Sequence, residues 1–333
     1  MGVMGRAPRI EYAGAIYHVM NRGNHLEAIF RDDRDRVIFL RTLKEVCESA
    51  GWVVHSFVLM KNHYHLLIET QRATLVKGMQ WLNSTYTRRY NVRNKTFGHL
   101  FQGRYKALLV DVKEEGYFLT VSDYIHMNPV RVGRVKTLEQ LLEDSWSSAR
   151  WLAGKGKGRP TWLRWERVYG ELGMKEWGDG ERGEYVKYLE QRVAVAKKEG
   201  DRWQTVRRGW CLGGEEFKKK MRKKLEELSE EGLRQGESWS GEAVDELEET
   251  MAVRMLEEGA GRFGYGTFGE VRGSDRGVLA YWVRSRSKVS VRWLAERLGM
   301  KTPNGLSSVI WQVSKRLEND RQLKKRWRQL ENT

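Results

Sequence analysis

Two strand-like segments that follow one another almost without a break set the strongest limit on the fold. The segment WVVHSFVLMK (52–61) is rich in β-branched and aromatic residues, and HYHLLIE (63–69) continues that pattern. Only Lys61-Asn62 lies at the join, as a tight turn or as a bulge in the ladder. Segments joined this closely pair as antiparallel neighbours. The chain is therefore expected to contain an antiparallel sheet.

Helical and strand patterns on both sides of this strand pair give the order of the expected secondary-structure elements. Apolar residues at helical spacing alternate with strand patterns to give the order β-α-β-β-α-β-α. This order predicts an α+β fold: a ferredoxin/RRM-like split βαβ antiparallel sheet with helices on one face. The last helix should stop near Asn128-Pro129, because proline disfavours helix in the residue before it. The expected strands are 15–23, 52–61, 63–69 and 103–112, and the expected helices are 31–51, 74–93 and 113–127.

Charge and composition restrict the class of protein. The 333-residue chain carries a formal net charge of +16, which suggests a polyanionic partner, most commonly nucleic acid, although a merely soluble basic surface is the alternative. Only Cys47 and Cys211 are present, too few and too distant for a disulfide framework or a zinc site. No signal peptide or membrane-spanning run is found, so a soluble, cytoplasmic and nucleoid-associated protein without a membrane partner is expected.

The composition and the pattern of the sequence change after residue 150, and the new pattern predicts a mostly α-helical C-terminal region. The segment AGKGKGRP (153–160) is a linker or an exposed loop, RQGESWSGEA (234–243) is a second linker, and GAGRFGYGTFGE (259–270) is a flexible joint. Two short amphipathic patterns around Pro303-Asn304, within 290–317, predict a helix-turn-helix, with an ordinary helical hairpin as the alternative. The expected domains are a catalytic domain (8–150), a basic, Trp-rich helical extension (151–235) and a helical domain (241–333).

The clearest candidate for chemistry is a histidine pair. All seven histidines precede residue 130. Because strand residues alternate between faces, His63 and His65 share one face, whereas Tyr64 points to the other. Two imidazoles side by side suit a divalent metal, although two histidines could also be adjacent by chance.

A second motif could complete such a site. In SDYIHMNPVR (122–131), Tyr124 and Asn128 are four residues apart and project from one helix face, with His126 on another face. An amide oxygen as metal ligand and a phenol that attacks phosphorus would support a metal-assisted phosphoryl transfer. Tyr117, seven residues before Tyr124, stays open as a rival nucleophile, although no amide follows it at the same spacing.

Taken together, these motifs resemble a known family. NHYHLLIE followed by YIHMNPVR, with YHVMNRGN before them and FQGRYKALLV between, is similar to the single-tyrosine HUH transposases of the IS200-like family, and most of all to REP-associated tyrosine transposases. The resemblance covers about residues 8–150.

This resemblance implies a mechanism. His63, His65 and Asn128 would hold a divalent metal, Mg²⁺ or Mn²⁺, with Asn128 at a position where related enzymes often carry Gln. Tyr124 would attack single-stranded or hairpin DNA, and a 5′-phosphotyrosine and a free 3′-hydroxyl would form. The residue between the histidines is usually a bulky aliphatic one, and Tyr64 departs from that pattern. Such transposases act as monomers or as homodimers.

Basic residues near the expected catalytic face are candidates for contacts with the DNA backbone. They are Arg22, Arg104, Lys106 and Arg131, and solvated surface charge is the alternative for each of them. The helix-turn-helix would add binding to duplex DNA. A second functional hypothesis is a catalytically retired DNA-binding regulator that acts through this helix-turn-helix. The presence of both histidines, the tyrosine and the asparagine favours the enzyme.

Overall fold

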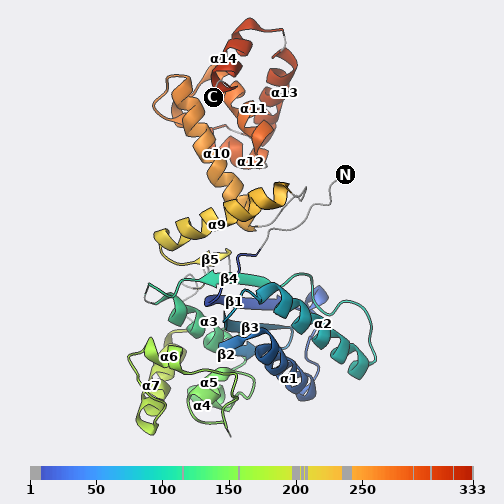
Figure 1. Ribbon diagram of the computed structural model, residues 1–333, viewed down its shortest axis with the longest axis vertical. Helices are drawn as coiled ribbons and strands as arrows, with labels where there is room; N and C mark the ends of the chain where they lie inside the picture. Colours follow the sequence, from blue (N-terminus) through green and yellow to red (C-terminus); the bar gives the residue numbers. More distant parts are fainter. Residues whose placement is uncertain are drawn as a thin grey trace. The chain divides into compact units, whose positions relative to one another are not determined.

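A computed structural model provides the structure of the chain (Figure 1). Its described residues form two compact units, one of residues 9–223 and one that includes residues 224–333. None of the helices in the described ranges is long and apolar enough to cross a membrane. The structure describes residues 9–331 except for 115, 157, 197–202, 204, 205, 207, 208, 235–241, 288, 301 and 318.

A five-stranded sheet forms the centre of the first unit, and its strand order β2-β3-β1-β4-β5 confirms the mixed α+β architecture. Strand β3 separates β2 from β1, and β1 separates β3 from β4, as in a split βαβ arrangement. These neighbours are all antiparallel, whereas β5 pairs in parallel with β4 and was not expected from the sequence. The strands are β1 (Ala15–Arg22), β2 (Trp52–Leu59), β3 (His63–Thr70), β4 (Lys106–Val110) and β5 (Cys211–Leu212).

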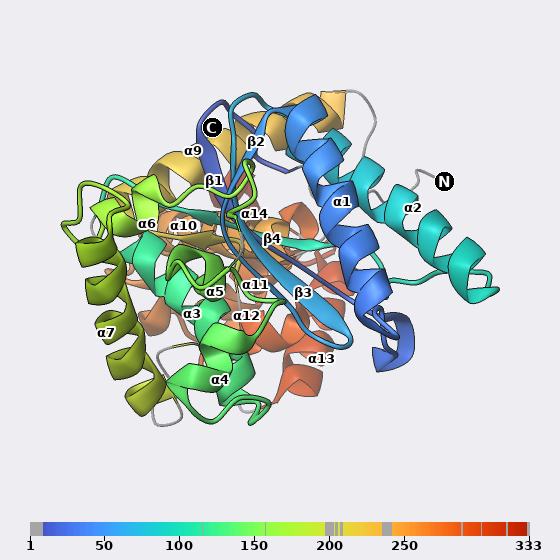
Figure 2. The same ribbon diagram turned by 90° about the horizontal axis from the view of Figure 1, so that it is seen from below.

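Two long helices, α1 (Asp33–Ala50) and α2 (Leu75–Asn94), cover one face of this sheet (Figure 2). The Phe39 ring of α1 lies 4.8 Å, centroid to centroid, from the Tyr64 ring of β3. The Tyr64 hydroxyl donates a hydrogen bond of 2.9 Å to Oδ1 of Asn83 in α2. The tyrosine between the two histidines of β3 is therefore a core residue on this face.

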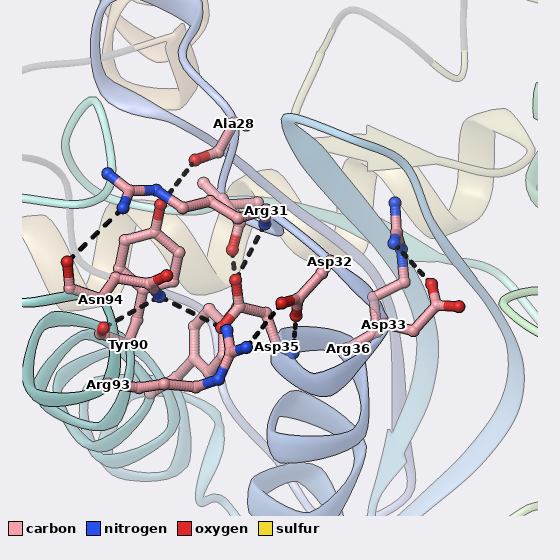
Figure 3. A network of polar contacts seen from close by, with 11 residues as sticks. Ala28, Arg31, Asp32, Asp33, Asp35, Arg36, Tyr90, Arg93 and Asn94 are labelled. Carbon is pink, nitrogen blue, oxygen red and sulfur yellow. Dashed lines mark hydrogen bonds and ion pairs between the residues drawn. The ribbon is translucent and has the colours of Figure 1, made fainter.

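A fully buried carboxylate fastens the start of α1 to the end of α2 (Figure 3). Asp35 accepts hydrogen bonds from the Arg93 guanidinium at 2.6 Å, from the Asn94 side chain at 3.2 Å and from the Arg31 amide at 2.8 Å. Arg93 also pairs with Asp32, which caps α1 by accepting from the Asp35 amide. This network holds the two helices in register against the sheet.

The helix α3 (Tyr117–Arg131) lies on the opposite face of the sheet (Figure 2). The ring of its Tyr124 is 5.4 Å from the ring of His65, and His65 points away from the face to which Tyr64 points. The expectation that the helices lie on one face therefore holds for α1 and α2 and is wrong for α3. The physical reason is the burial of the strands, since β3 is buried at five consecutive positions and both of its faces need a cover.

The expected end of this helix at Asn128-Pro129 is also wrong. Proline lacks an amide proton, so one hydrogen bond is lost at Pro129, but α3 continues to Arg131. The amide of Val132 bonds the carbonyl of Asn128, and the amide of Gly133 bonds that of Val130, so the last turn closes after the proline. Asn128 thus remains a helical residue.

The segment after residue 131 packs back on α3. The His126 ring of α3 bonds the Ser148 hydroxyl at 2.7 Å and the Tyr185 hydroxyl at 3.2 Å. Of the two interpretations of residues 153–160, an exposed loop agrees with this packing, because the helices on both of its sides belong to the first compact unit. These helices are α4 (Leu138–Glu143), α5 (Ser148–Leu152), α6 (Glu166–Gly170) and α7 (Asp179–Ala196).

The second unit is helical, and its core includes Leu256, Leu279, Leu294 and Leu306, which are all fully buried. Residues 259–262 form the end of helix α10, so the flexible joint expected at 259–270 begins inside a helix. The second expected linker, 234–243, falls mostly on residues outside the described ranges. The expected domain boundaries remain predictions. The remaining helices are α9 (Glu215–Arg234), α10 (Glu242–Arg262), α11 (Gly273–Arg286), α12 (Val291–Arg297), α13 (Pro303–Arg316) and α14 (Arg321–Glu331), with the short helices η1 (Asn24–Leu26) and η3 (Phe268–Glu270).

Helices α12 and α13 occupy the segment expected to form a helix-turn-helix. Pro303 is the first residue of α13 and follows the cap Thr302, so it does not lie in the turn as expected; its fixed φ suits that position. On α13, Leu306 and Val313 are buried and Trp311 is 62% exposed. The inward and outward faces therefore agree with the sequence pattern, whereas a role in binding DNA remains a prediction.

Candidate active site

One face of the sheet gathers histidines from two strands. In the β1–β3 ladder Met20 stands opposite His65, and Arg22 stands opposite His63. Directly paired residues project to the same side, as do residues two apart in one strand. His18 therefore shares this face with His63 and His65. The sequence predicted the pair in β3, and the structure adds a third imidazole from β1.

The half-buried His63 is held as a neutral imidazole. Its Nδ1 lies 2.8 Å from Oδ1 of Asn62. Burial, reinforced by the positive charges of Arg22 and Arg134, lowers the pKa of His63 to about 4, although a hydrogen bond with the Asn128 side chain opposes this shift. The ring is thus uncharged near pH 7 and is close to the asparagine of α3.

The second histidine, His65, is buried against His18. Their rings are stacked with centroids 5.1 Å apart, and Nε2 of His18 is 2.9 Å from Nδ1 of His65. Burial lowers the pKa of His18 to about 3, a shift that the backbone of Val206 partly offsets. Among the described residues no well-aligned hydrogen bond reaches Nδ1 of His18, so the contact with Val206 is a weak one.

The phenol of Tyr124 is brought directly to these imidazoles. Its ring centroid is 5.5 Å from that of His18 and 5.4 Å from that of His65. The Arg131 guanidinium lies 4.9 Å from the centroid of the Tyr124 ring, and the Trp203 ring is 5.7 Å away. Tyr124 is only 4% exposed under these neighbours.

The other two α3 side chains considered from the sequence lie elsewhere. Tyr117 is the first residue of α3, about two turns before Tyr124, and the histidine rings contact Tyr124 instead. His126 is buried, and its pKa is lowered to about 3 by that burial. With Ser148 and Tyr185 as its partners, His126 has a packing role on the side of α7.

The donor atoms of this face fit a divalent cation. Among the described residues, no three His, Cys, Asp or Glu side chains converge as a metal site. The rings of His63 and His65 are, however, perpendicular with centroids 5.1 Å apart, and Asn128 reaches His63 with its side chain. Two imidazoles and an amide oxygen would form a ligand set that leaves coordination positions open for a substrate.

Comparison with known proteins shows which family the N-terminal part of the chain is similar to. Residues 11–128 match the model of the family "Transposase IS200 like". Residues 11–128 are therefore similar to the IS200-like transposases. Among solved structures, the chain is similar to a REP-associated tyrosine transposase bound to a REP hairpin, at 13% sequence identity and a TM-score of 0.37, over 49% of this chain and 97% of that one. No curated protein matches the chain.

Three of the four basic residues singled out in the sequence lie on the histidine face of the IS200-like domain. Arg22 is exposed and stands opposite His63 in the ladder. Lys106 is exposed and pairs with Met20, so it projects to the same side. Arg131 lies on the Tyr124 ring. The structure therefore groups these three cations around the histidines and the phenol.

The fourth basic residue, Arg104, lies apart from this group. It lines a cleft of about 990 Å³ between α2 and residues 96–105. Because α2 covers the opposite face of the sheet, Arg104 is not part of the histidine site. Its contact with DNA remains a prediction that concerns another surface of the IS200-like domain.

Sequence reasoning missed several side chains of this site. His18 occurs in YHVMNRGN, and its spacing from Met20 and Arg22 could have revealed it, had the β1–β3 register been known. Arg134 lowers the pKa of His63 from a loop after α3. Trp203 is about eighty residues beyond Tyr124, and no local pattern connects the two.

Proposed function

We propose that this transposase cleaves and rejoins single-stranded DNA that forms hairpins, with Tyr124 as the nucleophile. The observation that carries the proposal is the position of the Tyr124 ring, 5.4 Å from the ring of His65 and on the same face of the sheet as His63. A phenol beside imidazoles and cationic side chains suits an attack on a phosphodiester. The bond formed joins the Tyr124 oxygen to phosphorus, and the bond broken releases a 3′-hydroxyl.

His63, His65 and Asn128 would hold a divalent metal, Mg²⁺ or Mn²⁺. When bound, this metal would polarise the scissile phosphate and stabilise the charge that develops on it. Burial keeps His63 uncharged near neutral pH, as a metal ligand must be. The guanidinium of Arg131, which faces the Tyr124 ring, would stabilise negative charge on the phenol oxygen during the attack.

The cations around the site would hold the DNA backbone. Arg22 and Lys106 project from neighbouring positions of the histidine face and are exposed. Phosphate contacts of this kind set the register of a strand without reading its sequence. The C-terminal helices α12 and α13 would bind duplex DNA as a helix-turn-helix, since α13 exposes small polar, aromatic and basic side chains.

A labelled hairpin oligonucleotide with a 3′ or 5′ single-stranded flank tests this function. The wild-type protein with Mg²⁺ or Mn²⁺ should form a covalent protein–DNA adduct that survives a denaturing gel, and EDTA should abolish it. Tyr124→Phe removes one hydroxyl and should eliminate the adduct. Tyr117→Phe is the matched control and should form the adduct as the wild type does.

The opposite results are equally informative. An adduct that persists in Tyr124→Phe and disappears in Tyr117→Phe would reverse the assignment of the nucleophile. If the wild-type protein binds the hairpin and forms no adduct with either metal, the retired regulator that acts through the C-terminal helices becomes the better explanation.

A further inference from the structure

Each histidine of the proposed metal site has its Nδ1 occupied by another side chain of this chain. Oδ1 of Asn62 is 2.8 Å from Nδ1 of His63, and Nε2 of His18 is 2.9 Å from Nδ1 of His65. We propose that His18 is a positioning residue, which accepts the Nδ1 proton of His65 and thereby presents Nε2 of His65 as a lone-pair donor. This inference rests on the proposed function and names the residue that prepares one of its ligands.

The argument follows from counting protons on the two rings. A neutral imidazole has one N–H and one lone pair, so only one of the two facing nitrogens donates in the His18–His65 contact. If His18 donated, the proton of His65 would lie on Nε2, and neither nitrogen of His65 would be free to bind a metal. If His65 donates from Nδ1, the lone pair is on its Nε2.

The neighbouring ligand shows the same arrangement with an unambiguous acceptor. The atom of Asn62 that faces His63 is its carbonyl oxygen, which can only accept a hydrogen bond. In the neutral ring, the proton of His63 is therefore on Nδ1 and the lone pair is on Nε2. Two ligands that both offer Nε2 from adjacent positions of one strand face can converge on one ion.

The surroundings of His18 suit a fixed acceptor. Its side chain is fully buried, and the ring stacks on His65 and meets the edge of the Tyr124 ring. In the β1–β4 ladder Leu108 stands opposite His18, so an apolar neighbour flanks it on the other side. The backbone of Val206 also faces the ring and raises its pKa, which burial lowers more strongly. Partners of this kind in metalloproteins fix the tautomer and orientation of the ligand.

The test measures tautomers and metal affinity in the full-length protein, independently of DNA cleavage. Long-range ¹H–¹⁵N spectra of metal-free protein labelled with ¹⁵N-histidine show which ring nitrogen carries the proton, and single His→Gln variants assign the signals. His63 and His65 should both carry it on Nδ1. Loss of the free Mn²⁺ signal in electron paramagnetic resonance then gives the affinity for Mn²⁺ alone.

Three variants separate a positioning role from a merely structural one. His18→Leu removes the acceptor and should move the proton of His65 to Nε2 and weaken Mn²⁺ binding by about 10- to 100-fold. His18→Gln keeps a carbonyl acceptor and should restore both the tautomer and the affinity. Asn62→Ala should change the tautomer of His63 and leave that of His65 unchanged.

Each outcome supports or overturns the proposal. A proton on Nε2 of His65 in the metal-free wild type overturns it even if His18→Leu does not fold. It is also overturned if a folded His18→Leu protein keeps the wild-type tautomer and Mn²⁺ affinity. If the tautomers are as expected but the wild type does not bind Mn²⁺, the orienting role of His18 stands and the metal-dependent function fails.

Discussion

Single side chains determine whether the histidine face can do chemistry. The burial that lowers the pKa of His63 keeps its imidazole uncharged, and the neighbouring guanidinium groups of Arg22 and Arg134 act in the same direction. An uncharged ring beside two cations can bind a metal without adding to the positive charge that attracts DNA. The proposed ligand is therefore an uncharged ring that lies beside two cations.

The first residue-level prediction concerns His63. His63→Ala removes a proposed ligand and should reduce cleavage of a labelled hairpin by more than about 100-fold, since even partners outside the ligand shell cost 10- to 100-fold. Hairpin affinity and the thermal unfolding midpoint should stay close to wild type, because the ring is only half-buried. The exposed His99 provides the control variant His99→Ala. Full cleavage by His63→Ala in the presence of metal would contradict the metal site.

A second residue-level prediction concerns stability and pH. Burial lowers the pKa of His55, with a partial offset from Glu69, whose own pKa is lowered by the bond to His55. The unfolded state, with a histidine pKa of about 6.5, therefore binds a proton before the folded state does. The free energy of unfolding should fall as pH drops below about 6.5, by at most about 1.4 kcal/mol per pH unit for this group.

Urea unfolding at several pH values measures this slope. His55→Gln should make the slope between pH 6.5 and pH 5 shallower, whereas His99→Gln, on the surface, should leave it unchanged. An equal slope in His55→Gln and wild type would show that other groups dominate the acid sensitivity.

Among the elements, α1 and α2 depend on the buried Asp35 carboxylate between them. Arg93→Met leaves this carboxylate without its guanidinium partner and should lower the free energy of unfolding by about 3 kcal/mol, the low end for breaking a buried pair, because the Arg93 side chain is 25% exposed. Lys44→Met removes a pair in which both side chains are more than half exposed, and it should cost less than about 0.5 kcal/mol. Equal urea midpoints for the two variants would contradict the role of the network.

The sequence predicts those features that depend on neighbouring residues, and it does not predict those that depend on contacts between distant parts of the chain. The strand pair 52–61 and 63–69 and the helix with Tyr124 follow from local periodicity, and the structure confirms them within a few residues. The continuation of α3 past Pro129 does not follow from local periodicity, because it depends on hydrogen bonds made after the proline. His18 joins the site through the strand register, and Trp203 does so through packing far along the chain. Neither is a local property.

For the whole molecule, we predict a division of labour between the two compact units. A truncation that ends near residue 235 removes α10 to α14 and keeps every histidine and the sheet. It should still cleave a single-stranded hairpin, but bind duplex DNA more weakly and with a shallower dependence on salt, because fewer phosphates are neutralised. Fluorescence anisotropy at several salt concentrations measures this.

A single substitution provides the matched control for the truncation. Lys315→Ala on the exposed face of α13 should reduce duplex affinity and the salt slope in the same direction, by about one phosphate contact. If the truncated protein binds duplex DNA as tightly as the full chain at every salt concentration, α12 and α13 are a protein-interaction module and not a DNA-binding one.

The burial of Tyr124 has a consequence for the time course of the reaction. Because Tyr124 is only 4% exposed, with Arg131 on its ring and Trp203 close by, we expect that these neighbours must shift before a phosphodiester can reach the phenol. Encounter with DNA and formation of the adduct are then separate events in time. In single-turnover experiments the rate of adduct formation should level off as the concentration of DNA rises, at a ceiling set by the protein's own rearrangement and shared by good and poor substrates alike.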